Sequence, residues 1–260
     1  MRWRSRIVFC CIAVVASVAA RAGAAALPLG ASLAGGQSLP DPWGLSVTVY
    51  GQSQKYELTS LSFDLPGVTV DKGTIGIENV VQEGNAEVDL WLLPFLNLFA
   101  IGGKIDGKTD VNLGDVQGLP VRLDNLRITY HGTVYGFGTT LAGGNDTYFG
   151  SLTYTWTNES LGGQFDSTAS AWLIGPRVGI HDKWGSAWIG ATYQKAQERH
   201  KGTIDLPFLG NVGFDVKLAD RHPWNLQAGV ETGLSRHWHM HIEGGFADRV
   251  STEMGFTYRF

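Results

Sequence analysis

Hydrophobic and polar side chains alternate with a period of two along most of the chain after Trp43. In the segment 150–157, for example, leucine, tyrosine and tryptophan alternate with serine and threonine. Successive side chains of a β-strand point to opposite faces, so this pattern predicts strands with one apolar and one polar face. From Trp43 onward no stretch places apolar residues at i, i+3, i+4 and i+7 over a helical length. The chain is therefore predicted to be all-β.

The predicted strands have regular lengths and connections. Several are about ten residues long, close to the 9 to 11 residues with which a strand crosses a bilayer at a tilt. Tight connections, such as 93–97 and 181–185, alternate with long ones. The ten predicted strands are 45–56, 86–92, 98–105, 122–142, 147–157, 166–180, 186–197, 224–234, 240–247 and 250–260.

Alternation alone fits two architectures. In a soluble β-sandwich the apolar face forms the core, whereas in a transmembrane barrel the apolar face contacts lipid and the polar face lines the lumen. The strand lengths, the rhythm of the connections and aromatic residues at strand ends, such as Trp91 and Trp184, favour the membrane. We predict an antiparallel transmembrane β-barrel of about ten strands, within a range of about eight to twelve. A secreted soluble β-sandwich is the alternative.

The first residues form a predicted export signal. Arginines near the start precede an apolar run from Ile7 to Ala20, and small residues follow at 22–24. This is the layout of a secretory signal peptide, and the run is too short to span a bilayer as a helix. We therefore divide the chain into a signal peptide at 1–24, a periplasmic leader at 25–42 and a barrel at 43–260, with long external loops at 58–85, 106–121 and 198–223.

Composition and charge narrow the range of partners. Glycine supplies 35 of the 260 residues and charged residues only 17%, which argues against a coiled coil and against a disordered chain. Both cysteines, Cys10 and Cys11, lie in the predicted signal, so the barrel is predicted to have no disulfide. Without the four arginines of the signal, 16 basic residues remain against 24 acidic ones, a net charge of −8. This balance argues against nucleic acid bound through its phosphates.

The last ten residues carry a family resemblance. Met254, Phe256, Tyr258 and Phe260 lie on one face of the closing strand. This strand resembles the closing strand of Gram-negative outer-membrane β-barrel proteins. The resemblance implies export, insertion by the barrel-assembly machinery, contact with outer-membrane lipids and a location in the outer membrane. It also implies that these four residues are the assembly signal.

Candidate chemistry is sparse. No combination of nucleophile, histidine and acid resembles the motifs of barrel enzymes that act on lipids or proteins. The strongest constellation is His237, His239 and His241, whose spacing of two places three imidazoles on one strand face, and imidazole is a common ligand of zinc, copper and nickel. The plainer interpretation makes them polar residues at the periplasmic mouth. No cofactor is predicted, and metal binding is kept as an alternative.

A set of charged residues is predicted to face the lumen. Such groups can line a selective pore, but buried charges more often pair with one another. We therefore predict an integral outer-membrane barrel with a structural, surface-interaction or limited permeation role and no catalytic centre. A barrel enzyme that modifies lipid A or phospholipid is a further alternative. The predicted lumen charges are Glu87, Asp89, Arg177, Glu231, Glu243 and Glu253.

Overall fold

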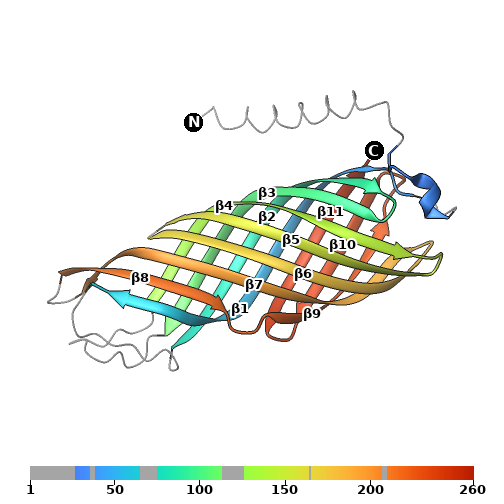
Figure 1. The fold of residues 1–260 in the computed structure, drawn as a ribbon. Coiled ribbons are helices and arrows are strands. Elements are labelled where there is room, and N and C mark those ends of the chain that lie inside the picture. Colours follow the sequence, from blue (N-terminus) through green and yellow to red (C-terminus); the bar gives the residue numbers. More distant parts are fainter. Residues whose placement is uncertain (1–26, 36–38, 65–74, 113–125, 164, 207–209) are drawn as a thin grey trace, which may run out of the picture.

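A computed structural model describes residues 27–35, 39–64, 75–112, 126–163, 165–206 and 210–260. The predicted signal peptide and parts of the predicted leader and loops lie outside these residues. Within the described part, a short 3₁₀-helix precedes eleven strands (Figure 1). The elements are η1 (Ala31–Ala34), β1 (Trp43–Phe63), β2 (Gly76–Leu93), β3 (Leu96–Asn112), β4 (Leu126–Gly144), β5 (Tyr148–Gly163), β6 (Asp166–Asp182), β7 (Gly185–Leu206), β8 (Gly210–Asp220), β9 (Trp224–Gly233), β10 (Trp238–Phe246) and β11 (Arg249–Arg259).

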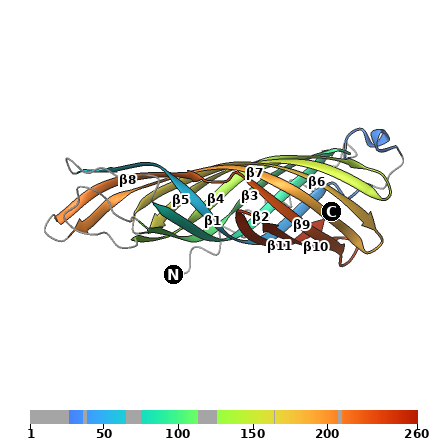
Figure 2. The same ribbon diagram turned by 90° about the horizontal axis from the view of Figure 1, so that it is seen from below.

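The described strands pair antiparallel, and the sheet closes on itself. Strand β11 pairs with β1, with Val47 opposite Phe256. Two backbone hydrogen bonds between Trp43 and Phe260, with N···O distances of 3.2 and 3.0 Å, fix the closing strand. Figure 2 shows the strands wrapped into a tilted cylinder. Closure leaves no free sheet edge, so the β-sandwich alternative is wrong.

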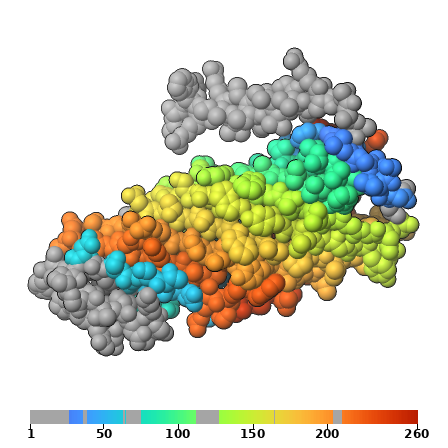
Figure 3. Space-filling view, in the orientation of Figure 1, coloured from blue at the N-terminus to red at the C-terminus, as the bar shows by residue number. Residues whose placement is uncertain are grey.

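Strand β8 divides the barrel into two sections of different width. It pairs with β1 and β7 at one end of the barrel, whereas β11 and β9 pair with the same two strands near the tight turns. Figure 3 shows β8, in orange, beside the cyan part of β1. We call the ten-stranded part the belt section (residues 43–54, 83–103, 134–157, 171–194 and 224–260) and the eight-stranded part the outer section (residues 55–63, 76–82, 104–112, 126–133, 158–163, 166–170, 195–206 and 210–220).

The belt section is apolar outside and polar inside. The hydrophobic side chains of Val47, Val178 and Ile189 are 60 to 66% exposed. Polar side chains such as Thr48 and Gln227 point inward, where they line a cavity. A water-soluble monomer rarely exposes so continuous an apolar surface, whereas lipid requires one. The fold is therefore an antiparallel transmembrane β-barrel, with ten strands in the membrane.

Aromatic side chains mark both edges of the apolar belt. At the edge away from the tight turns, Tyr193 contacts Trp172 and Trp224, with ring centroids 5.3 and 5.1 Å apart. At the other edge, the Tyr258 ring lies 5.1 Å from that of Trp238. Such rings are typical of residues at the level of the lipid head groups.

The outer section has the opposite arrangement, with charged side chains outside and a mainly apolar interior that also contains buried polar side chains such as Asn79 and His200. Ile128 and Leu218, each only 1% exposed, lie in its core. On its surface, Arg127 pairs with Asp110 at 2.6 Å, and the Arg127 guanidinium lowers the pKa of that carboxyl. This is the pattern of a water-soluble domain, so we expect the outer section to project beyond the membrane. Its core contains Tyr56, Leu58, Ile75, Ile77, Val81, Ile105, Val111, Ile128, Tyr130, Leu161, Ala169, Ala196, Phe214, Val216 and Leu218.

The structure differs from the predicted long loops. Much of 58–85, 106–121 and 198–223 is strand in the described residues, and β8 lies wholly within the third of these segments. The prediction ended each strand at the length that a bilayer requires, but burial of the outer core stabilises strands that continue into solvent. The ten predicted strands correspond to β1–β7 and β9–β11, so the prediction of about ten membrane strands is confirmed.

The tight connections lie where the sequence predicted them. Strand β2 ends at Leu93 and β3 begins at Leu96, while β6 ends at Asp182 and β7 begins at Gly185. Gly185 has a φ of 131°, and an added Cβ would lie 2.0 Å from the backbone oxygen of Glu231. Only glycine fits this turn without displacing the neighbouring strand.

Candidate functional site

A cavity of about 500 Å³ fills the centre of the belt section. Its wall contains eight carboxylates but only three arginines. This excess of acidic groups creates a negative potential in a confined space, which favours cations. The carboxylates are Glu83, Glu87, Asp89, Glu159, Glu198, Glu231, Glu243 and Glu253, and the arginines are Arg177, Arg249 and Arg259.

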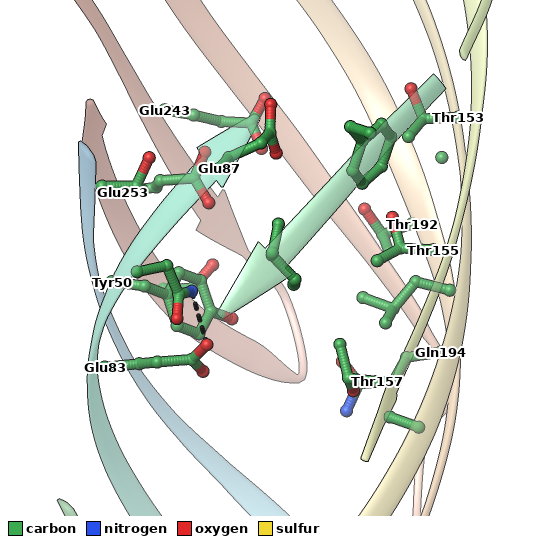
Figure 4. Close-up of a pocket in the computed structure, with 18 of the residues that line it drawn as sticks. Tyr50, Glu83, Glu87, Thr153, Thr155, Thr157, Thr192, Gln194, Glu243 and Glu253 are labelled. Atoms are coloured by element: carbon green, nitrogen blue, oxygen red, sulfur yellow. Dashed lines mark hydrogen bonds between the residues drawn. The ribbon is translucent and has the colours of Figure 1, made fainter. Parts of the chain in front are cut away.

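The acidic and neutral polar groups occupy different walls of the cavity. Figure 4 shows four glutamates and Tyr50 on one side, carried by β1, β2, β10 and β11. Hydroxyl and amide side chains from β5 and β7 face them across the cavity. A cation between the walls could approach carboxylates on one side and oxygen atoms of neutral groups on the other. The neutral wall contains Thr153, Thr155, Thr157, Thr192 and Gln194.

All six predicted lumen charges line this cavity. Arg177 Nη2 lies 2.8 Å from a carboxylate oxygen of Glu243, which also accepts a hydrogen bond from Trp188 Nε1 at 2.7 Å. Asp89 pairs with Arg259 at 3.1 Å. Most of the set is thus paired, as expected for charges inside a barrel.

Glu87 differs from the other predicted lumen charges. The described residues offer its carboxylate no hydrogen-bond or ion-pair partner, although it lies in the cavity wall close to Asp89 and Glu253. An unpaired carboxylate is the group to which a small cation would bind most readily.

The structure separates the three histidines that the sequence suggested as metal ligands. His239 Nδ1 lies 3.6 Å from Glu231, and His241 Nε2 lies 3.1 Å from Glu253. His237 Nδ1 instead lies 3.3 Å from Asp41, in the segment before β1. Each imidazole therefore has its own carboxylate, and the described residues form no group of three or more ligands placed to hold a metal.

Five cavity charges were missed by the sequence prediction. Glu83 and Glu198 lay in predicted loops, Glu159 and Arg249 lay just beyond predicted strands, and Arg259 lay within the last predicted strand. Each of the five is an even number of residues away from other inward residues of its strand, as Glu83 is from Glu87 on β2. Following the alternation through the loops and to the end of the closing strand would have found them.

Glu159 lies beyond the aromatic ring, at the outer end of the cavity. Burial, helped by the nearby carboxylates of Glu198 and Glu83, raises the pKa of Glu159 to about 8. This carboxyl is therefore mostly protonated at neutral pH, which reduces the repulsion among the acids at this end of the cavity.

Comparisons with known proteins find solved outer-membrane proteins of low sequence identity. No protein-family model matches the chain, and no curated protein matches it. The outer membrane protease OmpT from Escherichia coli aligns with 10% identity and a TM-score of 0.49 over 85% of this chain and 97% of the protease. OprG from Pseudomonas aeruginosa aligns with 9% identity and a TM-score of 0.45 over 86% and 99% of the two chains. The transport unit of the autotransporter AIDA-I from Escherichia coli aligns with 13% identity and a TM-score of 0.43 over 88% of this chain and 96% of that unit.

Strand closure and the two-sided polarity of the belt decide the fold independently of these matches. The chain has the fold of an outer-membrane β-barrel. Among the described residues, no helix has the length and apolar character needed to cross a bilayer.

A buried hydrogen-bonded chain in the outer section has the residue types of a catalytic triad. Ser167 Oγ lies 2.7 Å from His200 Nδ1, and His200 Nε2 lies 3.2 Å from Glu198 Oε2. His200 is completely buried and Ser167 is 4% exposed, and neither lines the cavity. A nucleophile needs space for the reacting group beside it, which this packed position lacks. These three hydrogen-bonded side chains therefore supply polar contacts within the core of the outer section.

The outer end of the cavity is closed by the core of the outer section. Tyr56, Val81 and Ile105 line the cavity and belong to that core. Beyond them, Ile128 and Leu218 are almost completely buried. A hydrated ion moving along the barrel axis would have to lose its water among these apolar side chains, which is costly. The axis is thus blocked at this end.

Proposed function

We propose that this barrel is a narrow permeation protein of the Gram-negative outer membrane, in which the acidic cavity admits small cations and passes them slowly. The observation that carries the proposal is the excess of acidic side chains over arginines in a cavity of about 500 Å³, which is eight to three, or seven to three without the protonated Glu159. The apolar core beyond the cavity supports the low rate, because it leaves no wide aqueous channel along the axis.

The test is conductance across planar lipid bilayers containing the purified full-length barrel. We expect small or flickering steps, with a reversal potential in a salt gradient that indicates preference for cations. Large, steady steps like those of general porins would contradict the proposal, as would a preference for anions.

Replacing Arg177 by alanine should increase both the conductance and the cation preference. The substitution removes a positive charge from the wall, frees Glu243 and vacates part of the bore, so an increase of about twofold is expected. Arg127→Ala is the matched control, because Arg127 pairs with Asp110 on the outer surface, and its removal should leave the conductance unchanged. Equal effects of the two substitutions would show that the cavity is not the conducting path.

We also propose that the closing strand carries the assembly signal, with Met254, Phe256, Tyr258 and Phe260 as its residues. Tyr258 stacks against Phe260, and the Phe260 N–H donates a hydrogen bond to Trp43 O at 3.0 Å where the sheet closes. Deletion of Phe260 should therefore lower the amount of heat-modifiable barrel in the membrane fraction and increase aggregated precursor. Phe260→Tyr, which keeps the ring, should insert normally. Normal insertion after the deletion would refute this role.

A further inference from the structure

The wall of the barrel changes its strand number at one junction. Along β1, backbone pairing passes from β11 at Gln54 to β8 at Tyr56. Along β7, pairing passes from β9 at Tyr193 to β8 at Gln197. One strand thus replaces three, and the ladder is interrupted between the turns at 221–223 and 247–248 (Figure 1).

Polar side chains close this interruption. Asp220 accepts hydrogen bonds from Gln54 Nε2 at 3.0 Å, from Gln194 Nε2 at 3.2 Å and from a backbone N–H of β7 at 2.5 Å. The Arg249 guanidinium donates a further hydrogen bond to Gln194 Oε1, while its buried Nε has no hydrogen-bond partner among the described residues. We call Gln54, Gln194, Asp220 and Arg249 the junction cluster.

The junction cluster lies between the cavity and the surface. Gln194 and Arg249 line the cavity on its inner side. On the outer side, His222 Nδ1 of one turn lies 3.9 Å from Asp248 Oδ2 of the other, and both side chains are half exposed. Trp224, in the outer aromatic ring, lies two residues after His222. The junction therefore lies at the outer edge of the membrane belt. It is closed by these side chains and by one backbone hydrogen bond, from Gln194 N–H to Pro223 O at 2.8 Å.

The side route is physically easier than the axial route. The axial route requires apolar side chains such as Val216 and Leu218 to separate and a cation to enter their core. The side route requires only polar hydrogen bonds to exchange partners with water, and the carboxylate of Asp220 and the amide oxygens of Gln54 and Gln194 can solvate a cation. When one side chain of the junction cluster moves aside, the backbone pairing between the strands of the barrel stays intact.

We propose that small cations pass between the cavity and the outside through a side portal at this junction, gated by the junction cluster, and not along the barrel axis. The inference rests on the proposed permeation of cations, and it names the route by which they leave or enter the barrel.

The experiment measures how fast a cationic thiol reagent reaches the cavity from outside. Thr155→Cys places a thiol on the cavity wall at a residue outside the junction cluster, and a trimethylammonium methanethiosulfonate is added to intact cells. The chain without Thr155→Cys gives the background labelling. Asp220→Ala and Val216→Ala are then compared, because both change inward positions of β8 but only the first belongs to the junction cluster.

We expect Asp220→Ala to speed modification of the introduced thiol about tenfold, since three hydrogen bonds that hold the portal closed are lost. Gln54→Ala removes one of these hydrogen bonds and should speed modification by a smaller factor. It provides the test if the Asp220→Ala barrel fails to insert into the membrane. Val216→Ala should leave the rate within about twofold of its starting value, because the core remains apolar. Heat-modifiable migration confirms that each variant forms a barrel.

Faster modification with Val216→Ala, or no change with Asp220→Ala and Gln54→Ala in folded barrels, would overturn the side portal. Absence of modification in all variants would overturn it as well. Bilayer conductance separates this result from the proposed function. A cation conductance that is insensitive to the junction cluster rejects only the portal, whereas portal-dependent modification without any cation conductance rejects the permeation role.

Discussion

Replacing Leu218 by alanine is expected to lower the free energy of unfolding by about 2 to 5 kcal/mol, the range for deleting a fully buried leucine side chain. Leu218 is 1% exposed and lies on β8 in the core of the outer section. The strands around it are closed into a ring of eight, so neighbouring side chains cannot move far to fill the space left behind. The measurement is urea unfolding of the barrel in detergent micelles.

Lys217→Ala is the matched control for Leu218→Ala. Lys217 is the neighbouring residue on β8 and points to the outer surface, so its truncation should change the free energy of unfolding by less than about 0.5 kcal/mol. A loss below about 1 kcal/mol for Leu218→Ala would mean that the outer section is loosely packed. In that case the axial route through the barrel would no longer be blocked by a dense core.

The strand architecture of the belt section could be predicted because lipid imposes a simple rule. The residues of a strand such as β9 that face lipid are apolar, and its inward residues can be polar, so a period of two appears directly in the sequence. The tight turns followed from the same pattern. The sequence therefore indicated ten membrane strands and their order.

Strand β8 could not be found by the same rule. Its inward residues, Phe214, Val216 and Leu218, are apolar because they face a core, and its outward residues, Asp215 and Lys217, are charged because they face water. This inverts the polarity of the belt while keeping the period of two. The change from three strands to one at the junction depends on long-range pairing, which local periodicity does not encode.

The cavity was predictable in its charge but not in its pairing. The alternation placed Glu87, Arg177 and Glu243 on the inner face, where the structure has them. It could not show that Arg177 reaches Glu243 on β10 across 66 residues of sequence. For the same reason, the regular spacing of the histidines suggested a shared metal, whereas tertiary pairing gives each imidazole a different carboxylate partner.

Arginine in place of Val230 should destabilise the barrel by about 2 to 4 kcal/mol, the cost of this side chain on the lipid face near the bilayer midplane. Val230 is 49% exposed and lies within β9, between Ile242 of β10 and Ala187 of β7. Its side chain therefore has only hydrocarbon beside it in a membrane. The free energy of unfolding of the inserted barrel in lipid vesicles is the quantity to measure.

Gln227→Arg, three residues earlier on the same strand, separates the two faces of β9. Gln227 is 6% exposed, lines the cavity and accepts a hydrogen bond from Thr192. An arginine there would lose this hydrogen bond but would enter a cavity with an excess of carboxylates, so its cost should be smaller than that of Val230→Arg. If the two variants were destabilised equally in vesicles, lipid would not be the medium around the belt. The proposed cation cavity and side portal both require lipid around the outside of the belt section. The comparison of the two variants therefore also tests the proposed function.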